Sequence, residues 1–114
     1  MPKSLGEFEQ LILFATLRLG EDAYGASIRR EIEECTGRPV TAGSVYTVLD
    51  RLESRGLVAS FIGEPTPQRG GRRKKYYHIE RKGAELLHHT HEAQQRMASG
   101  TTGRLEELLK DPTA

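Results

Sequence analysis

The chain has 114 residues, enough for one domain, and its 17 basic and 16 acidic side chains leave a formal net charge of +1, which argues against a uniformly basic nucleic-acid binder. The charge is nevertheless uneven. Residues 1–68 hold 7 basic and 10 acidic side chains, residues 69–82 hold 7 and 1, and residues 83–114 hold 3 and 5, so the net charges are −3, +6 and −2. One basic segment in an acidic chain indicates a localised contact with a polyanion.

Apolar side chains are concentrated in the first half of the chain. Leu, Ile, Val and Phe total 25, of which 19 lie in residues 1–62 and 6 in residues 63–114. The second half therefore has to pack against the first half or against another chain. The single cysteine excludes an internal disulfide, and the lack of a long apolar run or a leader pattern predicts a cytoplasmic protein without a membrane partner.

The first predicted helix begins at a capping box, Ser4-Leu5-Gly6-Glu7, and ends at Gly20. Its apolar residues form two stripes on opposite sides of the helix. One stripe consists of Leu5, Phe8, Leu11, Ile12, Ala15 and Leu19, and the other of Leu13, Phe14 and Leu17. Because a helix that is apolar on two sides is buried on two sides, we expect the second stripe to face a partner chain.

A second helix is predicted from Asp22 or Tyr24 to Gly37, with an inner face of Ile28, Ile32 and Cys35. A redox sensor is one interpretation of Cys35. Its place on the apolar face of the helix favours a small buried core residue instead.

The third helix is predicted over 42–55, with Thr41 as its N-cap. Its apolar stripe consists of Val45, Val48, Leu49 and Leu52. The remaining face and its flanks present small polar residues together with an aromatic and a basic side chain, namely Gly43, Ser44, Tyr46, Thr47 and Arg51. We expect this stripe to anchor the helix in the core while the polar face stays exposed.

Two strands follow, over residues 57–63 and 74–79, and they predict a long-tipped β-hairpin. Alternation along the second strand points Tyr77 and Ile79 inward and Tyr76 and His78 outward. The hairpin tip, within residues 64–75, combines two glycines with five cations, Arg69, Arg72, Arg73, Lys74 and Lys75. A flexible cationic tip suits a phosphate backbone or a narrow minor groove.

A last helix is predicted from Glu80 onward, with Gly100 and Gly103 as interruptions or kinks and a final apolar stripe of Leu105, Leu108 and Leu109. His88, His91 and Glu92 share spacing that a metal site could use, but a polar surface is the favoured interpretation, and we expect no metal or cofactor. The chain contains no phosphate loop, nucleophile elbow or HExxH sequence, so no enzyme activity is expected.

The order of three helices and a hairpin predicts a mainly α fold with a small β-hairpin, the winged helix-turn-helix. In this fold the third helix enters the major groove of double-stranded DNA and the hairpin, or wing, contacts the flanking backbone. The predicted DNA contacts are Thr41, Gly43, Ser44, Tyr46, Thr47, Arg51, Arg69, Arg72, Arg73, Lys74 and Lys75.

The sequence also resembles the PadR-like transcriptional regulators over roughly residues 5–80. The residues that carry the resemblance are Tyr24-Gly25 and Ile28, Gly43-Ser44-Val45-Tyr46 through Glu53, Gly56-Leu57-Val58, Gly70-Gly71-Arg72-Arg73-Lys74 and Tyr76-Tyr77. The resemblance implies a homodimeric regulator, usually a repressor, acting on an inverted-repeat operator. It also implies that the C-terminal helix of each protomer packs on the N-terminal helix of the other.

Two segments follow from this combination, a DNA-binding domain over 1–79 and a C-terminal helical dimerisation segment over 80–114. The expected dimer interface consists of Leu13, Phe14, Leu17, Leu87, His91, Met97, Leu105 and Leu108. The resemblance further implies release by a planar aromatic effector near that interface, for which Phe8, Phe14 and Met97 are the candidate contacts. Two other functions fit the sequence: a winged-helix module that binds a protein, and a metal- or thiol-responsive sensor.

Overall fold

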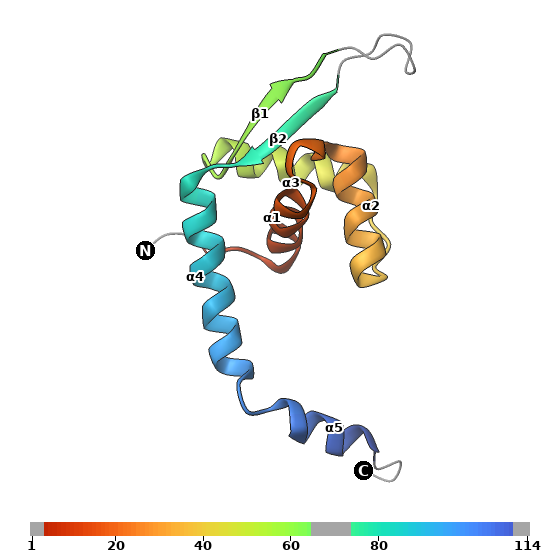
Figure 1. Cartoon of the computed structure of the whole chain (residues 1–114), viewed down its shortest axis with the longest axis vertical. Helices are drawn as coiled ribbons and strands as arrows, with labels where there is room; N and C mark the ends of the chain where they lie inside the picture. The colour runs from red at the N-terminus through yellow and green to blue at the C-terminus, as the bar shows by residue number, and fades with distance from the viewer. Residues whose placement is uncertain (1–3, 65–73, 111–114) are drawn as a thin grey trace.

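The computed structural model describes residues 4–64 and 74–110, and most of these residues are helical (Figure 1). The elements, in chain order, are α1 (Glu7–Leu19), the short 3₁₀ turn η1 (Gly20–Asp22), α2 (Gly25–Thr36), α3 (Ala42–Ser54), β1 (Val58–Ile62), β2 (Lys75–Ile79), α4 (Arg81–Ala98) and α5 (Thr102–Lys110). β1 and β2 form one antiparallel hairpin. The predicted fold class, mainly helical with a small hairpin, is confirmed.

Helix α1 begins later than its sequence predicts. Its N-cap is Gly6 rather than Ser4, and the Gly6 N–H donates a hydrogen bond to Glu9 Oε1 at 2.8 Å. The prediction was wrong because Leu5 is buried in the core before the helix starts, while the Gln10 side chain donates to the Leu5 carbonyl oxygen. The predicted end is confirmed at Gly20, whose φ of 59° suits a glycine.

Helix α1 lies at the centre of the body, with α2, α3, α4 and the hairpin around it (Figure 1). The buried side chains from all of these elements form one core, which includes Ile12, Leu13, Ile28, Ile32, Val45, Leu49, Leu52, Leu57, Val58, Tyr77 and Leu87. The predicted stripe of α3 is therefore confirmed. The expectation for Leu13 needs a correction: it is 0% exposed, so it has no surface to offer to a second chain.

Cys35 was expected in the core, and this expectation is wrong. Its side chain is exposed, because residues 34–37 at the end of α2 are all exposed to solvent. The thiol lies 3.4 Å from Glu31 Oε2, and this contact raises the pKa of Cys35 above its ordinary value. A raised pKa disfavours the reactive thiolate.

The hairpin register places Val58 opposite Ile79 and Ser60 opposite Tyr77. Tyr77 is buried and His78 exposed, as predicted, whereas Ile79 and Tyr76, predicted to point in opposite directions, are both half-buried. The Tyr77 N–H also donates to the Ala23 carbonyl oxygen at 2.8 Å. This bond attaches the hairpin to the segment that immediately precedes α2.

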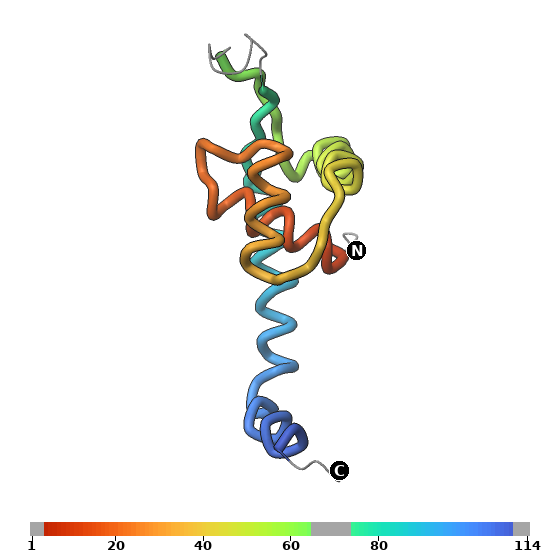
Figure 2. Tube along the Cα trace, turned by 90° about the vertical axis from the view of Figure 1, so that its right-hand side faces the viewer, coloured from red at the N-terminus to blue at the C-terminus, as the bar shows by residue number. Residues whose placement is uncertain are grey.

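The C-terminal helices extend away from the body (Figure 2). Helix α4 starts against the hairpin, where a Cβ on Gly83 would lie 2.2 Å from the Leu57 carbonyl oxygen, so the two backbones touch. Every described residue from 94 to 110 is exposed. The predicted interruption occurs at Gly100, with φ of 81°, whereas Gly103 lies inside α5. In the described ranges, no helix is long and apolar enough to cross a membrane.

Candidate nucleic-acid interface

The exposed face of α3 is the first part of the candidate interface. The Thr41 hydroxyl caps the helix by accepting a hydrogen bond from the Ser44 N–H at 3.2 Å, which confirms Thr41 as the N-cap. Gly43, Thr47 and Arg51 are exposed, and Ser44 is half-buried. Because a Cβ on Gly43 would meet nothing within 4 Å, the N-terminal end of α3 is open to an approaching molecule.

Tyr46 connects α3 to α2. Its ring lies directly on Gly25, the first residue of α2, where a Cβ would be 2.4 Å from Tyr46 Cζ. A glycine is therefore required for the two helices to approach this closely. The Tyr46 side chain still remains 46% exposed. It is thus fixed on one side by α2 and available for contact on the other.

The basic segment is described only from Lys74 onward, and Arg69, Arg72 and Arg73 lie outside the described residues. Lys74 and Lys75 contact different parts of the body. Lys75 Nζ lies 3.6 Å from Glu53 Oε1 of α3. The Glu53 carboxylate accepts a hydrogen bond from the Ser60 hydroxyl and pairs with Lys75, so it connects α3 to both strands of the hairpin. The Ser60 hydrogen bond, followed by the Lys75 charge, lowers the pKa of Glu53.

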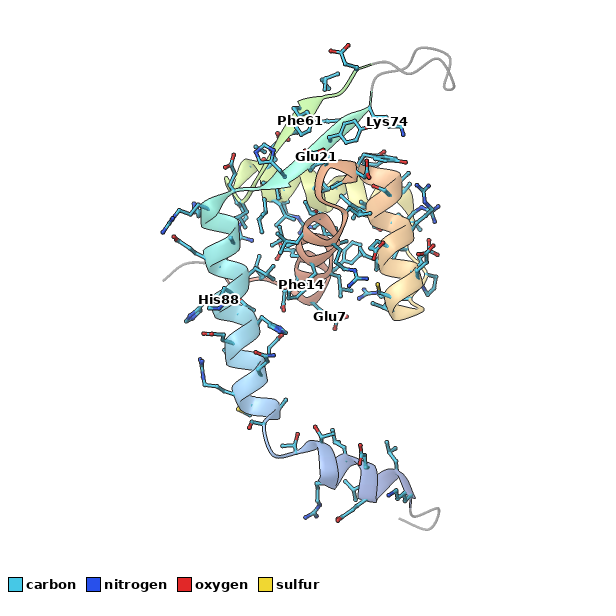
Figure 3. The ribbon with its side chains drawn as sticks, viewed as in Figure 1. Glu7, Phe14, Glu21, Phe61, Lys74 and His88 are labelled. Carbon is cyan, nitrogen blue, oxygen red and sulfur yellow. The ribbon has the colours of Figure 1, made fainter. Side chains whose placement is uncertain are left out.

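Lys74 instead contacts Tyr24, a residue that the sequence analysis assigned to the start of a helix and to no site. Lys74 Nζ lies 3.9 Å from the centroid of the Tyr24 ring, and Figure 3 shows Lys74 at the end of the hairpin above α2. Arg30 Nη2 donates a hydrogen bond to the Tyr24 hydroxyl at 3.1 Å. This bond and the nearby Lys74 charge lower the pKa of Tyr24.

A chain of contacts thus runs from α3 to the end of the hairpin. Tyr46 of α3 lies on Gly25 of α2, and the adjacent Tyr24 contacts Lys74. The next residue of the hairpin, Lys75, pairs with Glu53 of α3. Tyr46 of α3 and Lys74 at the end of the hairpin therefore contact the same end of α2, whereas Lys75 contacts α3. Such an arrangement can place a helix against base edges and cations against the flanking phosphates.

A second surface lies between α1 and α4 (Figure 3). It is an open, mostly apolar groove of about 510 Å³, lined by Phe14, Leu17, Arg81, Ala84, Glu85, Leu87, His88 and His91. The Phe14 and His91 rings meet edge to face at 5.2 Å. Leu17 is 50% exposed at this groove.

The residues predicted for the dimer interface therefore separate into three groups. Phe14, Leu17 and His91 line the groove, and Leu87 lines it from a buried position. Met97, Leu105 and Leu108 lie exposed on the C-terminal helices, beyond the groove. Leu13 belongs to the core.

The three candidate effector contacts are not brought together. Phe14 lines the groove, whereas Phe8 and Met97 do not. The Phe8 ring lies instead under the Arg38 guanidinium, 5.2 Å from its Cζ. Met97 is 82% exposed. His88 and Glu92 approach to 3.2 Å, but across the described chain no three His, Cys, Asp or Glu residues form a group that could hold a metal ion.

Comparison with known proteins identifies the type of molecule. A model of the transcriptional regulator PadR-like family matches residues 13–89. A PadR family transcription regulator from Clostridium difficile aligns over 88% of this chain and 99% of its own, with a TM-score of 0.69 and 24% sequence identity. A PadR-like regulator from Bacillus cereus gives 0.67 and 28%, over 86% and 89% of the two chains. A PadR family regulator from Eggerthella lenta gives 0.62 and 28%, over 89% and 87%. No curated protein matches.

Proposed function

Because the chain belongs to the PadR-like family of transcriptional regulators, we propose that it is a repressor that binds an inverted-repeat operator as a homodimer. The observation that carries this proposal is the continuous contact from Tyr46 through the start of α2 to Lys74. This contact holds the exposed face of α3 and the base of the wing together as one surface. The proposed role is regulation and not catalysis.

In the proposed complex α3 enters the major groove. Gly43 and Ser44 at its N-terminal end allow close approach to the base edges, and Tyr46, Thr47 and Arg51 reach bases or phosphates. The cations of the wing contact the backbone beside the groove, and Arg69, Arg72 and Arg73 are assigned this role from their sequence alone. Residues 1–79 then form the DNA-binding domain.

The proposed dimer uses residues 80–114 together with α1. Its support is the apolar groove beside Leu17 and the helical arm beyond residue 94, which has no buried residue in its described part. Leu105 and Leu108 are 57% and 52% exposed, and a second protomer would remove this apolar surface from water. We propose that the arm of each protomer covers the groove of the other. A small aromatic effector would bind beside Phe14 and His91 and weaken the complex.

The test of DNA binding is its dependence on salt. If each protomer neutralises about four phosphates, log K should fall with log salt with a slope of about −7. Fluorescence anisotropy with a labelled random duplex, measured from low to physiological salt, gives this slope. An affinity that does not change with salt, or no binding to any duplex, would contradict the proposal and favour a protein-binding module.

A further inference from the structure

Tyr24 lies at the junction of the hairpin and α2. Its ring meets the Tyr76 ring edge to face, with centroids 5.6 Å apart and planes at 70°. The main chains of the same two residues form a β-bridge, next to the hydrogen bond from the Tyr77 N–H to the Ala23 carbonyl oxygen. On the far side of Tyr76, Phe61 of β1 stacks on its ring at 5.6 Å. Both strands of the hairpin are therefore packed in series against Tyr24.

Tyr24 also contacts two cations, Lys74 at the end of the hairpin and Arg30 of α2. Lys74 Nζ is 3.9 Å from the ring centroid, well within the reach of about 6 Å for a cation–π contact. Arg30 donates to the hydroxyl at 3.1 Å, while its Cζ is 6.0 Å from the centroid. Lys74 thus lies on the face of the ring, and both Lys74 and Arg30 lie close enough to the Tyr24 hydroxyl to lower its pKa. A substitution that removes the hydroxyl still leaves the face of the ring for Lys74.

The Tyr46 ring of α3 packs directly on the next residue, Gly25. Consequently, the positions of α3 and of the wing base are both set by two consecutive residues at the start of α2. A lysine side chain has several rotatable bonds, and fixing them on binding costs affinity. A lysine that already rests on a fixed ring loses less freedom when it reaches a phosphate.

We propose that Tyr24 is a positioning residue for DNA binding, whose ring holds Lys74 at the spacing from α3 that a phosphate beside the major groove requires. The proposal rests on the proposed function and deepens it. Tyr24 acts through Lys74 and needs no contact of its own with DNA. Its aromatic face carries the role, and its hydroxyl does not.

Tyr24→Leu and Tyr24→Phe separate the two parts of the side chain. Tyr24→Leu removes the aromatic face and should weaken duplex binding about tenfold. It should also make the salt slope shallower by about 2, because each protomer of the dimer loses one phosphate contact. Tyr24→Phe keeps the face and should stay within about twofold of wild type. Lys74→Ala should reproduce the slope of Tyr24→Leu, and the double variant should show no further change.

Phe8→Leu is the matched control, because the Phe8 ring also makes a cation–π contact, in this case with Arg38. It should leave the salt slope unchanged. If Tyr24→Leu fails to fold, the NMR signals of the Lys74 ε-methylene protons in the wild-type protein provide the test, since the Tyr24 ring should shift them upfield.

The outcomes separate the two levels of the proposal. Wild-type protein that binds no duplex overturns both the function and the role of Tyr24. Wild-type binding together with an unchanged affinity and slope in Tyr24→Leu overturns only the positioning role. Lysine signals without a ring-current shift also overturn it.

Discussion

Leu17→Glu is expected to convert the protein to monomers and to weaken operator binding by about 100-fold or more. Leu17 is 50% exposed on the rim of the groove between α1 and α4, so the protomer should tolerate a carboxylate there. In the proposed dimer the same carboxylate would be removed from water against the apolar side chains of the other protomer's arm, which is strongly unfavourable. A monomer loses the gain in affinity that two linked half-site contacts provide. Analytical ultracentrifugation and operator titration measure the two effects.

Two further variants make the dimer test specific. Phe14→Glu, in the same groove, should also give monomers with weak operator binding. Cys35→Glu is the control, because it introduces the same charge at an exposed side chain of α2, outside α1 and residues 80–114. It should remain dimeric. An unchanged sedimentation mass in both Leu17→Glu and Phe14→Glu would show that the dimer does not form through this groove.

Reversing the wing charges is expected to have the second large effect. In the variant with Arg72, Arg73 and Lys74 changed to Glu, affinity should fall about 100-fold or more for all duplexes alike, because phosphate contacts carry no sequence information. The salt slope should become shallower by about 5, since a dimer loses six phosphate contacts. Anisotropy titrations with the operator and with an unrelated duplex measure both quantities.

A matched variant separates local from overall charge. Arg96→Glu, Arg104→Glu and Lys110→Glu together change the net charge by the same amount, but on the C-terminal helices. This variant should keep most of its DNA affinity as long as ultracentrifugation shows a dimer. Equal losses in the two triple variants would mean that total charge, and not the wing, determines binding. An interaction module would instead show negligible DNA binding before and after wing reversal, with loss of a protein partner.

Local patterns were sufficient to predict α3. Its N-cap at Thr41 and its buried stripe depend on residues three and four positions apart, and both are confirmed. The order of elements and the inward direction of Tyr77 follow from equally local rules. These features fix the fold class and the exposed face of the candidate recognition helix.

Features that depend on which element covers a surface could not be predicted in this way. A helical wheel places Leu13 and Cys35 on apolar stripes, but it does not show that the core surrounds Leu13 or that the end of α2 leaves Cys35 exposed. Tyr24 was missed for the same reason. Its contact with Lys74 joins residues that are distant in the sequence, and only the packing of the hairpin against α2 brings them together.

The central claim is that two copies of this chain read a symmetric DNA site. Selection of bound duplexes from a random pool by the wild-type protein tests it most directly, because one experiment reports binding, sequence preference and symmetry. We expect an enriched inverted repeat whose half-sites are centred about one helical turn apart, ~34 Å, in accord with two recognition helices related by a two-fold axis. A pool that remains unenriched, or that yields a single half-site without its inverted copy, would contradict the claim.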